Sequence, residues 1–450
     1  MIAAAASAIV PGFGQLLNGR RRFAQWFALP ALLLVAIVLL VVATRSPARL
    51  IASIVSPTAM GLLLTLNAIA LLWRLASVIH AFFDGRYPVW SGRAGAAGLA
   101  FVLVAVVVPH GIANAWGNTA QATFAQIFAA DGATGPGSPV AATDRQPGHD
   151  ERVNILVVGI DSVPGRTATL TDSMMVVSID PVGASVTIVS IPRDLVRVPL
   201  EGGTVFGPKL NSLMAYADRH PTEFPRGGMR TLQDAIGALL GIDIHYYAEL
   251  DFFGFVKLID AVGGIDVNVK KGFHDETYDG LGVNPKGVRG WGVKAGRHHF
   301  DGGEALAYAR VRKAPGESDL TRAARQQEVM VALRDRVMAD GSLLMNLPAL
   351  LSALGDLVTT DLPTARLPDL AAVADGMDPG AVVRVVIGKP LIKPGGIDPL
   401  YGSIQVPDLE AILAVSTGLF PPPGEAPVPW PTPEQTVAPT FEPPPSPESP

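Results

Sequence analysis

Residues 153–160 read VNILVVGI, an apolar run that is followed directly by Asp161. Two similar runs come next, MMVVSI at residues 174–179 and VTIVSI at residues 186–191. Each run is short, contains several β-branched residues and is bounded by turn-forming residues. This pattern is typical of strands that are buried in a sheet. The three runs therefore predict the centre of the fold.

Helical patterns follow these strands. Residues 231–240 have a helical pattern, and the apolar residues of 252–262 recur at the i, i+3, i+4, i+7 spacing of an amphipathic helix. Gly263 and Gly264 end that helix, and residues 265–269 form a further predicted strand. Strands that alternate with helices indicate an α/β sandwich.

The composition indicates that part of the chain lies in lipid. Of the 450 residues, 49% are hydrophobic and 17% are charged, against about 25% charged residues in an ordinary soluble domain. Three apolar runs lie near the N-terminus: Phe23–Ala43, the run between Arg49 and Arg74, and a run that starts near Ala94. Because about 20 apolar residues cross a bilayer as a helix, we predict three transmembrane helices within residues 23–116.

Basic residues set the predicted orientation. Arginines at 20–22 precede the first span, and Arg86 and Arg93 lie between the second and third spans. The loop between the first and second spans has only Arg45 and Arg49. By the positive-inside rule, the N-terminus is expected in the cytoplasm, and the chain after about residue 115 is expected outside the cell.

The first residues do not form a complete span. Residues 3–17 are apolar, but the segment is short and is broken by Pro11, Gly12 and Gly14. We interpret it as interfacial or re-entrant. A cleaved signal peptide is the alternative, although no charged region precedes this segment and further spans follow it.

Changes in composition define the remaining boundaries. Residues 131–150 are rich in Gly, Pro, Ser and Thr, which is typical of a flexible tether. In residues 421–450, proline occupies 13 of 30 positions, which predicts polyproline II without a core. The predicted regions are an N-terminal segment (1–22), transmembrane helices (23–116), a tether (117–150), an α/β domain (151–342), a C-terminal extension of the sheet or a small lobe (343–420), and a disordered tail (421–450).

Charge and cysteine content exclude several classes of protein. There are 35 basic and 40 acidic residues, for a net charge of −5, which argues against a generally basic nucleic-acid-binding protein. The chain has no cysteine, so disulfides, iron–sulfur clusters and thiol chemistry are excluded. It also contains no P-loop, nucleophile-elbow or zinc-protease motif.

Polar residues stand at the ends of the predicted strands, where α/β folds build binding sites. Asp161 follows the first strand, and Asp172 precedes the second. Arg193 and Asp194 follow Pro192, which ends the third strand. The alternative for Asp161 and Asp172 is that they only cap turns. The alternative for Arg193 is an ordinary solvated arginine after a strand.

Two arginines share a predicted strand at residues 308–312. Residues two apart in a strand lie on one face, so Arg310 and Arg312 are expected to point the same way. Two neighbouring guanidiniums repel each other unless an anion lies between them, and arginine binds phosphate in a bidentate manner. A solvent-facing edge strand is the alternative.

A further polar cluster follows. Asp319, Arg322 and Gln326 fall on one face of a predicted helix, with Arg325 beside them. A surface ion pair is the alternative. Taken together, the arginines and the two carboxylates predict a site for a pyrophosphate and a divalent metal, because Mg²⁺ binds one or two carboxylates together with phosphate oxygens.

In this order and spacing, the motifs resemble those of the LytR–CpsA–Psr family of cell-wall glycopolymer ligases. The resemblance covers about residues 153–338 and leaves out the membrane helices and the proline-rich tail. The matching stretches are NILVVGID, LTDSMMVVSID, SIPRDL, KLNSLMAYA, ELDFFGFVKLIDAVGGIDV, HFDGGEALAYARVR and DLTRAARQQ.

The resemblance implies an α/β/α sandwich with a central mixed sheet. It also implies an extracytoplasmic enzyme. Together with the three spans predicted from the apolar runs, this predicts a multi-pass protein of the cell membrane whose catalytic domain lies outside the cytoplasm. Such an enzyme transfers a glycopolymer from a polyprenyl-pyrophosphate donor to a peptidoglycan hydroxyl, forming a phosphodiester with Mg²⁺ (or Mn²⁺) as cofactor. Membrane lipid is then a partner, nucleic acid is not, and the helix at 252–262 matches part of the region that shelters the lipid chain.

The same resemblance assigns roles to individual residues. Asp161 and Asp172 match the metal-associated carboxylates. The pyrophosphate-binding set is matched by Arg193, Arg310, Arg312, Arg322 and Gln326, with Arg325 as a neighbouring candidate. Arg193, Asp194, Arg310 and Arg312 are the candidate catalytic residues, and either Asp194 or Asp172 is the candidate base.

One position departs from the family pattern. Members often carry an arginine two residues before the aspartate of the second motif, and this chain has Leu170 there, with Arg166 further upstream. Either Arg166 replaces that contact or the contact is absent. This departure supports an alternative function, a non-catalytic protein that binds prenyl-phosphate glycans. A pyrophosphatase that uses water as the acceptor is a third possibility.

Overall fold

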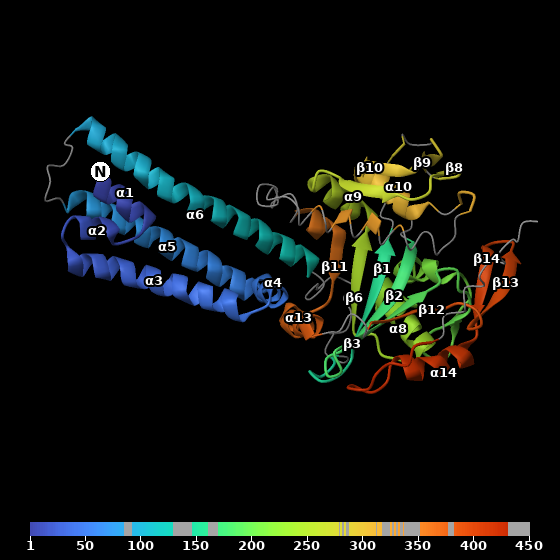
Figure 1. Ribbon diagram of the computed structural model, residues 1–450. Coiled ribbons are helices and arrows are strands. Elements are labelled where there is room, and N and C mark those ends of the chain that lie inside the picture. Colours follow the sequence, from blue (N-terminus) through green and yellow to red (C-terminus); the bar gives the residue numbers. More distant parts are fainter. Residues whose placement is uncertain are drawn as a thin grey trace, which may run out of the picture. The chain divides into compact units, whose positions relative to one another are not determined.

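The computed structural model describes the chain with several gaps. The described residues are 1–84, 92–128, 146–160, 170–278, 280, 283–284, 288–311, 313–316, 325, 328–329, 332–333, 336, 352–376 and 382–430. The chain forms two compact units (Figure 1). The first unit consists of Met1–Ala133, Ser162–Pro164 and Ala248–Asp375, and the second consists of Thr134–Asp161, Gly165–Tyr247 and Gly376–Pro450.

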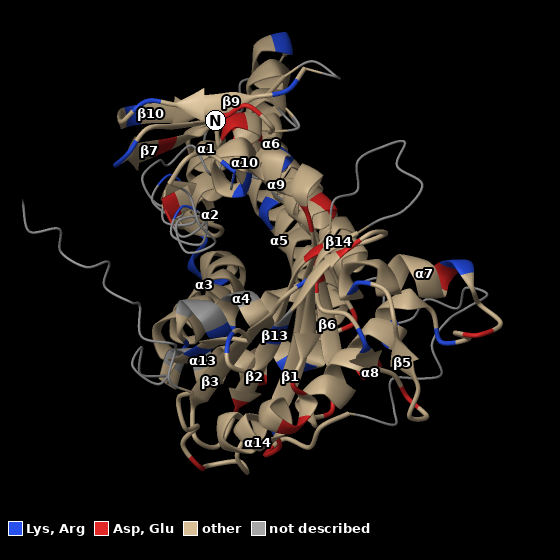
Figure 2. Ribbon diagram, turned by 90° about the vertical axis from the view of Figure 1, so that its right-hand side faces the viewer, with Lys and Arg blue, Asp and Glu red and all other residues tan. Residues whose placement is uncertain are grey.

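Three long helices of the first unit fit the predicted spans. They are α3 (Arg21–Thr44), α5 (Pro57–Phe83) and α6 (Arg93–Ile127), and all three are long and apolar enough to cross a membrane. Figure 2 colours the charged residues of the chain, and α3 and α5 contain three of them, Arg21, Arg22 and Arg74. The large apolar side chains of α3 are mostly exposed, as is expected of a surface that faces lipid. A short helix, α4 (Pro47–Val55), lies between α3 and α5.

The segment predicted to be interfacial or re-entrant forms a tight helical pair, α1 (Ile2–Ile9) and α2 (Phe13–Leu17), against α5. The side-chain amide of Gln15 donates to the carbonyl of Ser77 at 2.8 Å, so a buried polar group of α2 is satisfied by α5. Gly14 has no room for a side chain, because a Cβ there would lie 1.9 Å from the carbonyl oxygen of Ala3. Close packing and hydrogen bonding therefore hold this pair in the helical bundle.

Helix α6 is longer than the sequence analysis predicted. The tether was expected to begin at residue 117, but the helix continues to Ile127. Near its end, the side-chain amide of Gln126 donates to Asp356 at 3.2 Å. Residues 117–127 are therefore helical, and the prediction of a flexible tether there was wrong. Residues 129–145 of the predicted tether lie outside the described residues.

The second unit is built on a mixed sheet. Strands β1 (Val153–Ile160), β2 (Thr171–Asp180) and β3 (Ser185–Ile191) are successively antiparallel, and β12 (Val382–Val386) pairs with β3 in parallel. All three predicted apolar runs are thus confirmed as strands. The α/β class with a mixed sheet is also confirmed.

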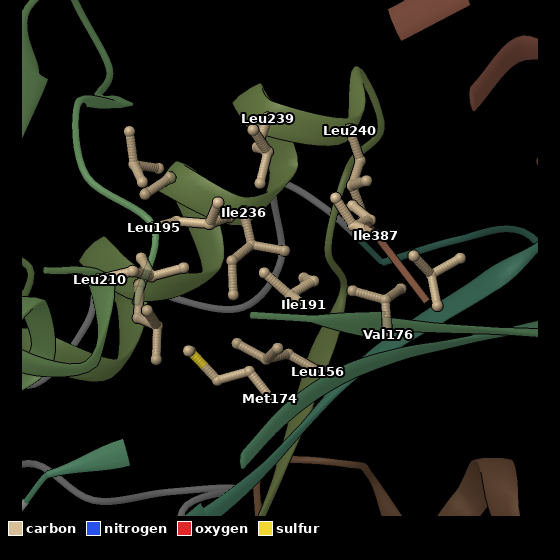
Figure 3. Close-up of a cluster of buried hydrophobic side chains, with 14 of the residues drawn as sticks. Leu156, Met174, Val176, Ile191, Leu195, Leu210, Ile236, Leu239, Leu240 and Ile387 are labelled. Carbon is tan, nitrogen blue, oxygen red and sulfur yellow. The ribbon is translucent and has the colours of Figure 1, made fainter. Parts of the chain in front are cut away.

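The core of this unit lies between the sheet and helix α8 (Gly228–Leu240), which confirms the helix predicted at 231–240. Figure 3 shows Leu156, Val176 and Ile191 of the strands facing Ile236 and Leu239 of the helix. Burying one such side chain completely contributes about 1.5–3 kcal/mol. The alternation of buried and partly exposed residues along β3 follows from its two-residue repeat.

The C-terminal residues belong to the same core. Strand β12 extends the sheet, and helix α14 (Leu409–Leu419) packs on α8. Between them, β13 (Ile392–Asp398) and β14 (Gly402–Pro407) form an antiparallel hairpin at the side of the sheet (Figure 1). Within residues 343–420, β12 therefore extends the sheet, whereas β13 and β14 form a separate two-stranded sheet.

The start of the predicted disordered tail is packed against the second unit. Arg152 donates to the carbonyl oxygens of Pro421 and Glu425, and it forms a 3.2 Å ion pair with Asp180. The amide of Gly424 donates to the same carboxylate, and Trp430 packs against the core. The prediction of disorder was therefore wrong for residues 421–430, and residues 431–450 lie outside the described part of the chain.

The part of the first unit that follows residue 248 has its own core. Helices α9 (Phe252–Ala261) and α10 (Gly302–Arg310) pack on each other and on the antiparallel pair β7 (Ile265–Val269) and β10 (Gly296–Phe300). The predicted helix at 252–262 and strand at 265–269 are confirmed. The remaining elements among the described residues are β4 (Val198–Pro199), β5 (Val205–Phe206), the 3₁₀ turn Leu210–Ser212, α7 (Leu213–Arg219), β6 (Tyr246–Asp251), β8 (Phe273–Asp275), β9 (Trp291–Val293), β11 (Val358–Thr360), the 3₁₀ turn Thr364–Arg366 and α13 (Leu367–Gly376).

Residues 308–310 are helical, although the sequence analysis predicted a strand at 308–312. Helix α10 begins with a capping box, in which Asp301 accepts from the amide of Glu304 and Glu304 accepts from the amide of Asp301. This cap starts a helix that runs to Arg310. The prediction that Arg310 and Arg312 share one face of a strand is therefore wrong, because Arg310 is helical, and Arg312 itself lies outside the described residues.

Candidate functional site

The candidate site of the second unit forms where strands β2 and β3 meet at one edge of the sheet. In the antiparallel pair of β2 and β3, Met174 lies opposite Ile191. Two residues further along each strand in the same register, Asp172 lies next to Arg193. The end of β1 reaches the same edge, because Ile160 pairs with Thr171. Asp161, which follows β1, lies outside the described residues.

An irregularity in β2 explains how the Asp172 side chain is presented. Gly159 pairs with Ser173 and Ile160 pairs with Thr171, so the pairing of β1 skips Asp172. A β-bulge of this kind turns a side chain away from the regular alternation of the strand, and bulges are frequent beside active sites. Asp172 is thus directed by the backbone, which a strand pattern in the sequence does not reveal.

Arg193 and Asp172 form an ion pair. The Nη1 atom of Arg193 donates to Oδ1 of Asp172 at 2.5 Å, and the two side chains are 25% and 19% exposed. A guanidinium has five N–H donors, and the described ion pair uses one of them. Because the pair is partly exposed, an anion that reaches this edge can bind the remaining donors of Arg193.

Asp194 has a partner that the sequence analysis did not assign. The Nζ atom of Lys209 donates to Oδ1 of Asp194 at 2.7 Å, and both side chains are partly exposed. The signal was present in the KLNSLMAYA stretch, where a lone lysine precedes the buried Leu210. Lys209 adds a second cation to this edge of the sheet.

The backbone around this loop is tied to the core. The amide of Asn211 donates to the carbonyl of Arg193 at 3.1 Å, and the amide of Leu210 donates to Leu195 at 2.8 Å. Leu195 and Leu210 are fully buried among the side chains of Figure 3. Apolar burial immediately after Asp194 therefore limits the movement of the loop that carries Arg193 and Asp194.

A divalent metal is compatible with the chemistry of the described residues. Mg²⁺ prefers one or two carboxylates with phosphate oxygens and water, and Asp172 supplies a partly exposed carboxylate. Among the described residues, no group of three or more His, Asp or Glu side chains is arranged as a closed metal cage. A metal here would therefore be held by few protein ligands together with a bound phosphate.

In the first unit, Arg310 lies over an aromatic ring. Its guanidinium carbon is 5.2 Å from the ring centre of Phe252, the first residue of α9. This cation–π contact places a positive charge at the start of the helix that the sequence analysis associated with lipid. An amphiphile that has an anionic and an apolar part matches such a combination.

Arg325 is buried, and its described contacts are with the protein. It is 5% exposed, donates to the carbonyl of Val311 and lies 4.5 Å from the ring centre of Phe273. The assignment of Arg325 to the substrate stays a prediction. The structure adds a packing role at the end of α10. Arg322 and Gln326 lie outside the described residues.

Asp275 fixes the segment that follows α10. Its carboxylate accepts from the amide and hydroxyl of Thr277 and from the amide of Lys313. Burial raises the pKa of Asp275, but the hydrogen bonds from Thr277 and Lys313 outweigh burial and hold this pKa below its ordinary value. The charged form is thus the one that the folded chain stabilises.

The pH dependence of stability should therefore change in an Asp275→Asn variant. The unfolded pKa of an aspartate is about 3.9, and a lowered folded pKa stabilises the fold above that value and loses this contribution as the pH falls through the folded pKa. Thermal unfolding of the full chain in detergent, measured from pH 7 to pH 3, should fall less steeply in Asp275→Asn than in the wild type. The exposed neighbour variant Glu276→Gln is the control, and equal slopes for Asp275→Asn and the wild type would contradict this assignment.

Comparison with known proteins identifies the family. The model of the LytR_cpsA_psr family matches residues 120–388, a range that contains both α9–α10 and the sheet edge with Asp172, Arg193 and Asp194.

Three curated relatives are similar over part of their length. The regulatory protein MsrR of Staphylococcus aureus is 34% identical over 222 residues, 49% of this chain and 59% of that protein. The cell wall biosynthesis protein LcpA of Corynebacterium glutamicum is 34% identical over 244 residues, 47% of this chain and 44% of that protein. The polyisoprenyl-teichoic acid–peptidoglycan teichoic acid transferase TagV of Bacillus subtilis is 37% identical over 186 residues, 41% of this chain and 43% of that protein.

These matches leave much of each relative uncovered, because the chain spans about half the length of the curated relatives that it matches. The crystal structure of B. subtilis TagV is similar at a TM-score of 0.41 and 27% identity, covering 60% of this chain and 96% of that one. Since the family model matches more than half of the 450 residues, the chain belongs to the LytR_cpsA_psr family.

Proposed function

We propose that this protein transfers a glycopolymer phosphate from a polyprenyl-pyrophosphate carrier to a hydroxyl of peptidoglycan and forms a phosphodiester in cell-wall assembly. The observation that carries the proposal is the partly exposed Arg193–Asp172 pair, with Asp194 and Lys209 beside it, in a chain of this family. Two cations at one sheet edge suit the negative charge of a diphosphate.

The reaction follows from where charge develops. The acceptor oxygen attacks the phosphorus that carries the glycan, a new P–O bond forms, and the P–O bond to the prenyl phosphate breaks. The acceptor hydroxyl loses its proton, and prenyl phosphate leaves with the electron pair of the broken bond. Negative charge grows on the bridging and non-bridging oxygens, where positioned donors lower the barrier.

Each candidate residue has a part in this reaction. We assign contacts with phosphate oxygens to Arg193, Arg310, Arg312, Arg322, Arg325 and Gln326. Both aspartates form ion pairs, Asp172 with Arg193 and Asp194 with Lys209. We assign Asp194 as the base, because Asp172 is a candidate metal ligand. Asp161 and Asp172 would hold Mg²⁺ (or Mn²⁺), which would neutralise charge on the phosphates.

The donor's lipid chain fits two features of the first unit. Three helices are long and apolar enough to cross a membrane, so the protein and a prenyl-linked donor would share the same bilayer. The contact of Arg310 with Phe252 combines a cation with an apolar surface. We infer the orientation from the basic residues of the sequence, with the catalytic residues outside the cytoplasm.

The names of relatives support the same assignment. TagV is named as a transferase that moves teichoic acid from a polyisoprenyl carrier to peptidoglycan, and LcpA is named as a cell wall biosynthesis protein. Another relative, MsrR, is named as a regulatory protein. The glycopolymer of the present protein is left open by these names.

The proposal is tested by mass spectrometry of a defined reaction. The full chain in detergent would be incubated with a synthetic prenyl-pyrophosphate oligosaccharide, peptidoglycan fragments and MgCl₂. The expected result is a glycan–phosphate–peptidoglycan product together with an equal amount of prenyl monophosphate, and no product when EDTA replaces MgCl₂. Release of free glycan phosphate alone would indicate a pyrophosphatase, and binding without any new product would indicate a binding protein. Either outcome would overturn the proposal.

A further inference from the structure

The β13–β14 hairpin lies beyond the residues that the family model matches, yet it contacts the candidate site. The match ends at residue 388, and the hairpin begins at Ile392. Its second strand, β14, contains Gln405, which forms an isolated parallel bridge with Leu195. Leu195 directly follows Asp194, so the hairpin reaches the loop of the candidate base.

Two backbone hydrogen bonds make this contact. The amide of Gln405 donates to the carbonyl of Asp194 at 3.1 Å, and the amide of Val196 donates to the carbonyl of Gln405 at 2.9 Å. The side-chain oxygen of Gln405 is shielded from solvent and has no hydrogen-bond partner among the described residues. The described hydrogen bonds from Gln405 to this loop are therefore made by its backbone.

The hairpin is itself anchored to the second unit. The amide of Asp408, just after β14, donates to the carbonyl of the buried Leu391 at 2.9 Å. Lys393 of β13 forms a 2.7 Å ion pair with Asp408, whose carboxylate also caps helix α14. Both ends of the hairpin are thus fixed, and β14 provides a firm support for the backbone at Asp194.

The two neighbouring site residues are held by different parts of the chain. Arg193 is held by the amide of Asn211 and by its ion pair with Asp172. The carboxylate of Asp194 is held by Lys209, and its carbonyl is held by Gln405 of the hairpin. A disturbance of β14 should therefore displace Asp194 more than Arg193.

We propose that the β13–β14 hairpin is part of the active site, and that Gln405 is a positioning residue that holds Asp194 through its backbone amide. This inference rests on the proposed transfer function, in which Asp194 takes the proton of the acceptor hydroxyl. A displacement of about 1 Å at a reacting group can cost up to about 10²-fold in rate. The hairpin should therefore affect the chemical step and leave donor binding in place.

The test compares two substitutions at one position in the full chain. Gln405→Pro removes the N–H that donates to Asp194, whereas Gln405→Thr keeps it and suits a strand. We expect kcat for transfer to be at least tenfold lower in Gln405→Pro than in Gln405→Thr. The Kd and the binding stoichiometry of the prenyl-pyrophosphate donor should be equal in the two variants. An unchanged stoichiometry shows that the loss of rate is not a loss of folded protein.

Two outcomes would overturn the inference: equal kcat values in the two variants, or a loss of donor binding that parallels the loss of rate. Should Gln405→Pro fail to fold, the variant Lys393→Glu tests the inference instead. It places two negative charges together at Asp408, and it should lower kcat severalfold with donor binding retained; wild-type kcat would overturn the inference.

Hydrogen exchange separates this inference from the proposed function. Even if the wild type transfers no glycan, the amide of Val196 should exchange slowly in the wild type and faster in Lys393→Glu. Rapid exchange of Val196 in the wild type would remove the structural basis of the inference.

Discussion

Replacing Arg193 by alanine is expected to lower the rate of glycan transfer by about 10²–10³, the typical effect of removing one positioned donor from a transition state. Arg193 lies at the sheet edge beside Asp172, and its guanidinium is exposed enough to meet a ligand. Alanine removes every donor at this position. Because the negative charge of the phosphates grows during the reaction, kcat should fall more than donor affinity.

The fold should survive this substitution. The loop is held by the backbone bond from Asn211 to residue 193 and by the burial of Leu195, neither of which needs the Arg193 side chain. Transfer rates and thermal unfolding of the full chain would be measured together. Arg219→Ala is the matched control, because this arginine lies in the same unit and donates to a carbonyl of its own helix.

Substitution by lysine refines the interpretation of this experiment. Arg193→Lys keeps the charge but loses the planar, bidentate geometry, so it should recover only part of the lost rate. Wild-type transfer by a correctly folded Arg193→Ala protein would show that the phosphate site lies elsewhere.

Among the substitutions proposed for this protein, Arg152→Met should lower the free energy of unfolding the most. Arg152 is 8% exposed and Asp180 is fully buried, so the substitution leaves a buried carboxylate without its cation. Breaking a buried ion pair in this way costs about 3–5 kcal/mol. The substitution also removes the hydrogen bonds that Arg152 donates to the carbonyls of Pro421 and Glu425.

Hydrogen exchange of peptides from β1 and β3 would measure this loss in the full chain, because core amides report free energies up to that of global unfolding. The control is Lys257→Ala, whose ion pair with Asp356 is largely exposed and should contribute less than about 1 kcal/mol. Peptides from 421–430 should lose protection in the Arg152 variant. Protection of β1 and β3 equal to that of the wild type would mean that Asp180 is stabilised without Arg152.

The strands and most helices follow from local patterns in the sequence. The apolar runs at 153–160 and 186–191 are bounded by turn residues, and the buried strands β1 and β3 form there. The strand predicted at 308–312 is wrong, because the alternating arginines belong to a stretch that a helix start at Asp301 has already made helical as far as Arg310. The Asp301-x-x-Glu304 sequence was the signal of a capping box.

The site could be predicted only in part, because a local sequence pattern reveals neither the register in which strands pair nor the contacts between distant segments. The sequence identified Asp172 and Arg193, and the register of β2 and β3 brings them together. It did not identify the partner of Asp194, because Lys209 comes from a separate turn. Composition also misjudged residues 421–430, where Trp430 and the partners of Arg152 fix a proline-rich segment.

Helix α6 is longer than a membrane span needs, and its C-terminal end contacts the part of the first unit that follows residue 248. Its 35 residues extend about 50 Å at 1.5 Å per residue, whereas the hydrocarbon layer is about 30 Å thick. The excess length forms a helical stalk that ends in the contact between Gln126 and Asp356. One residue added to this stalk would move the protein beyond it by about 1.5 Å along the helix axis and rotate it by about 100°. Height above the bilayer and azimuth are therefore set together, and an insertion or deletion in the stalk would preserve the facing direction only in steps of whole helical turns.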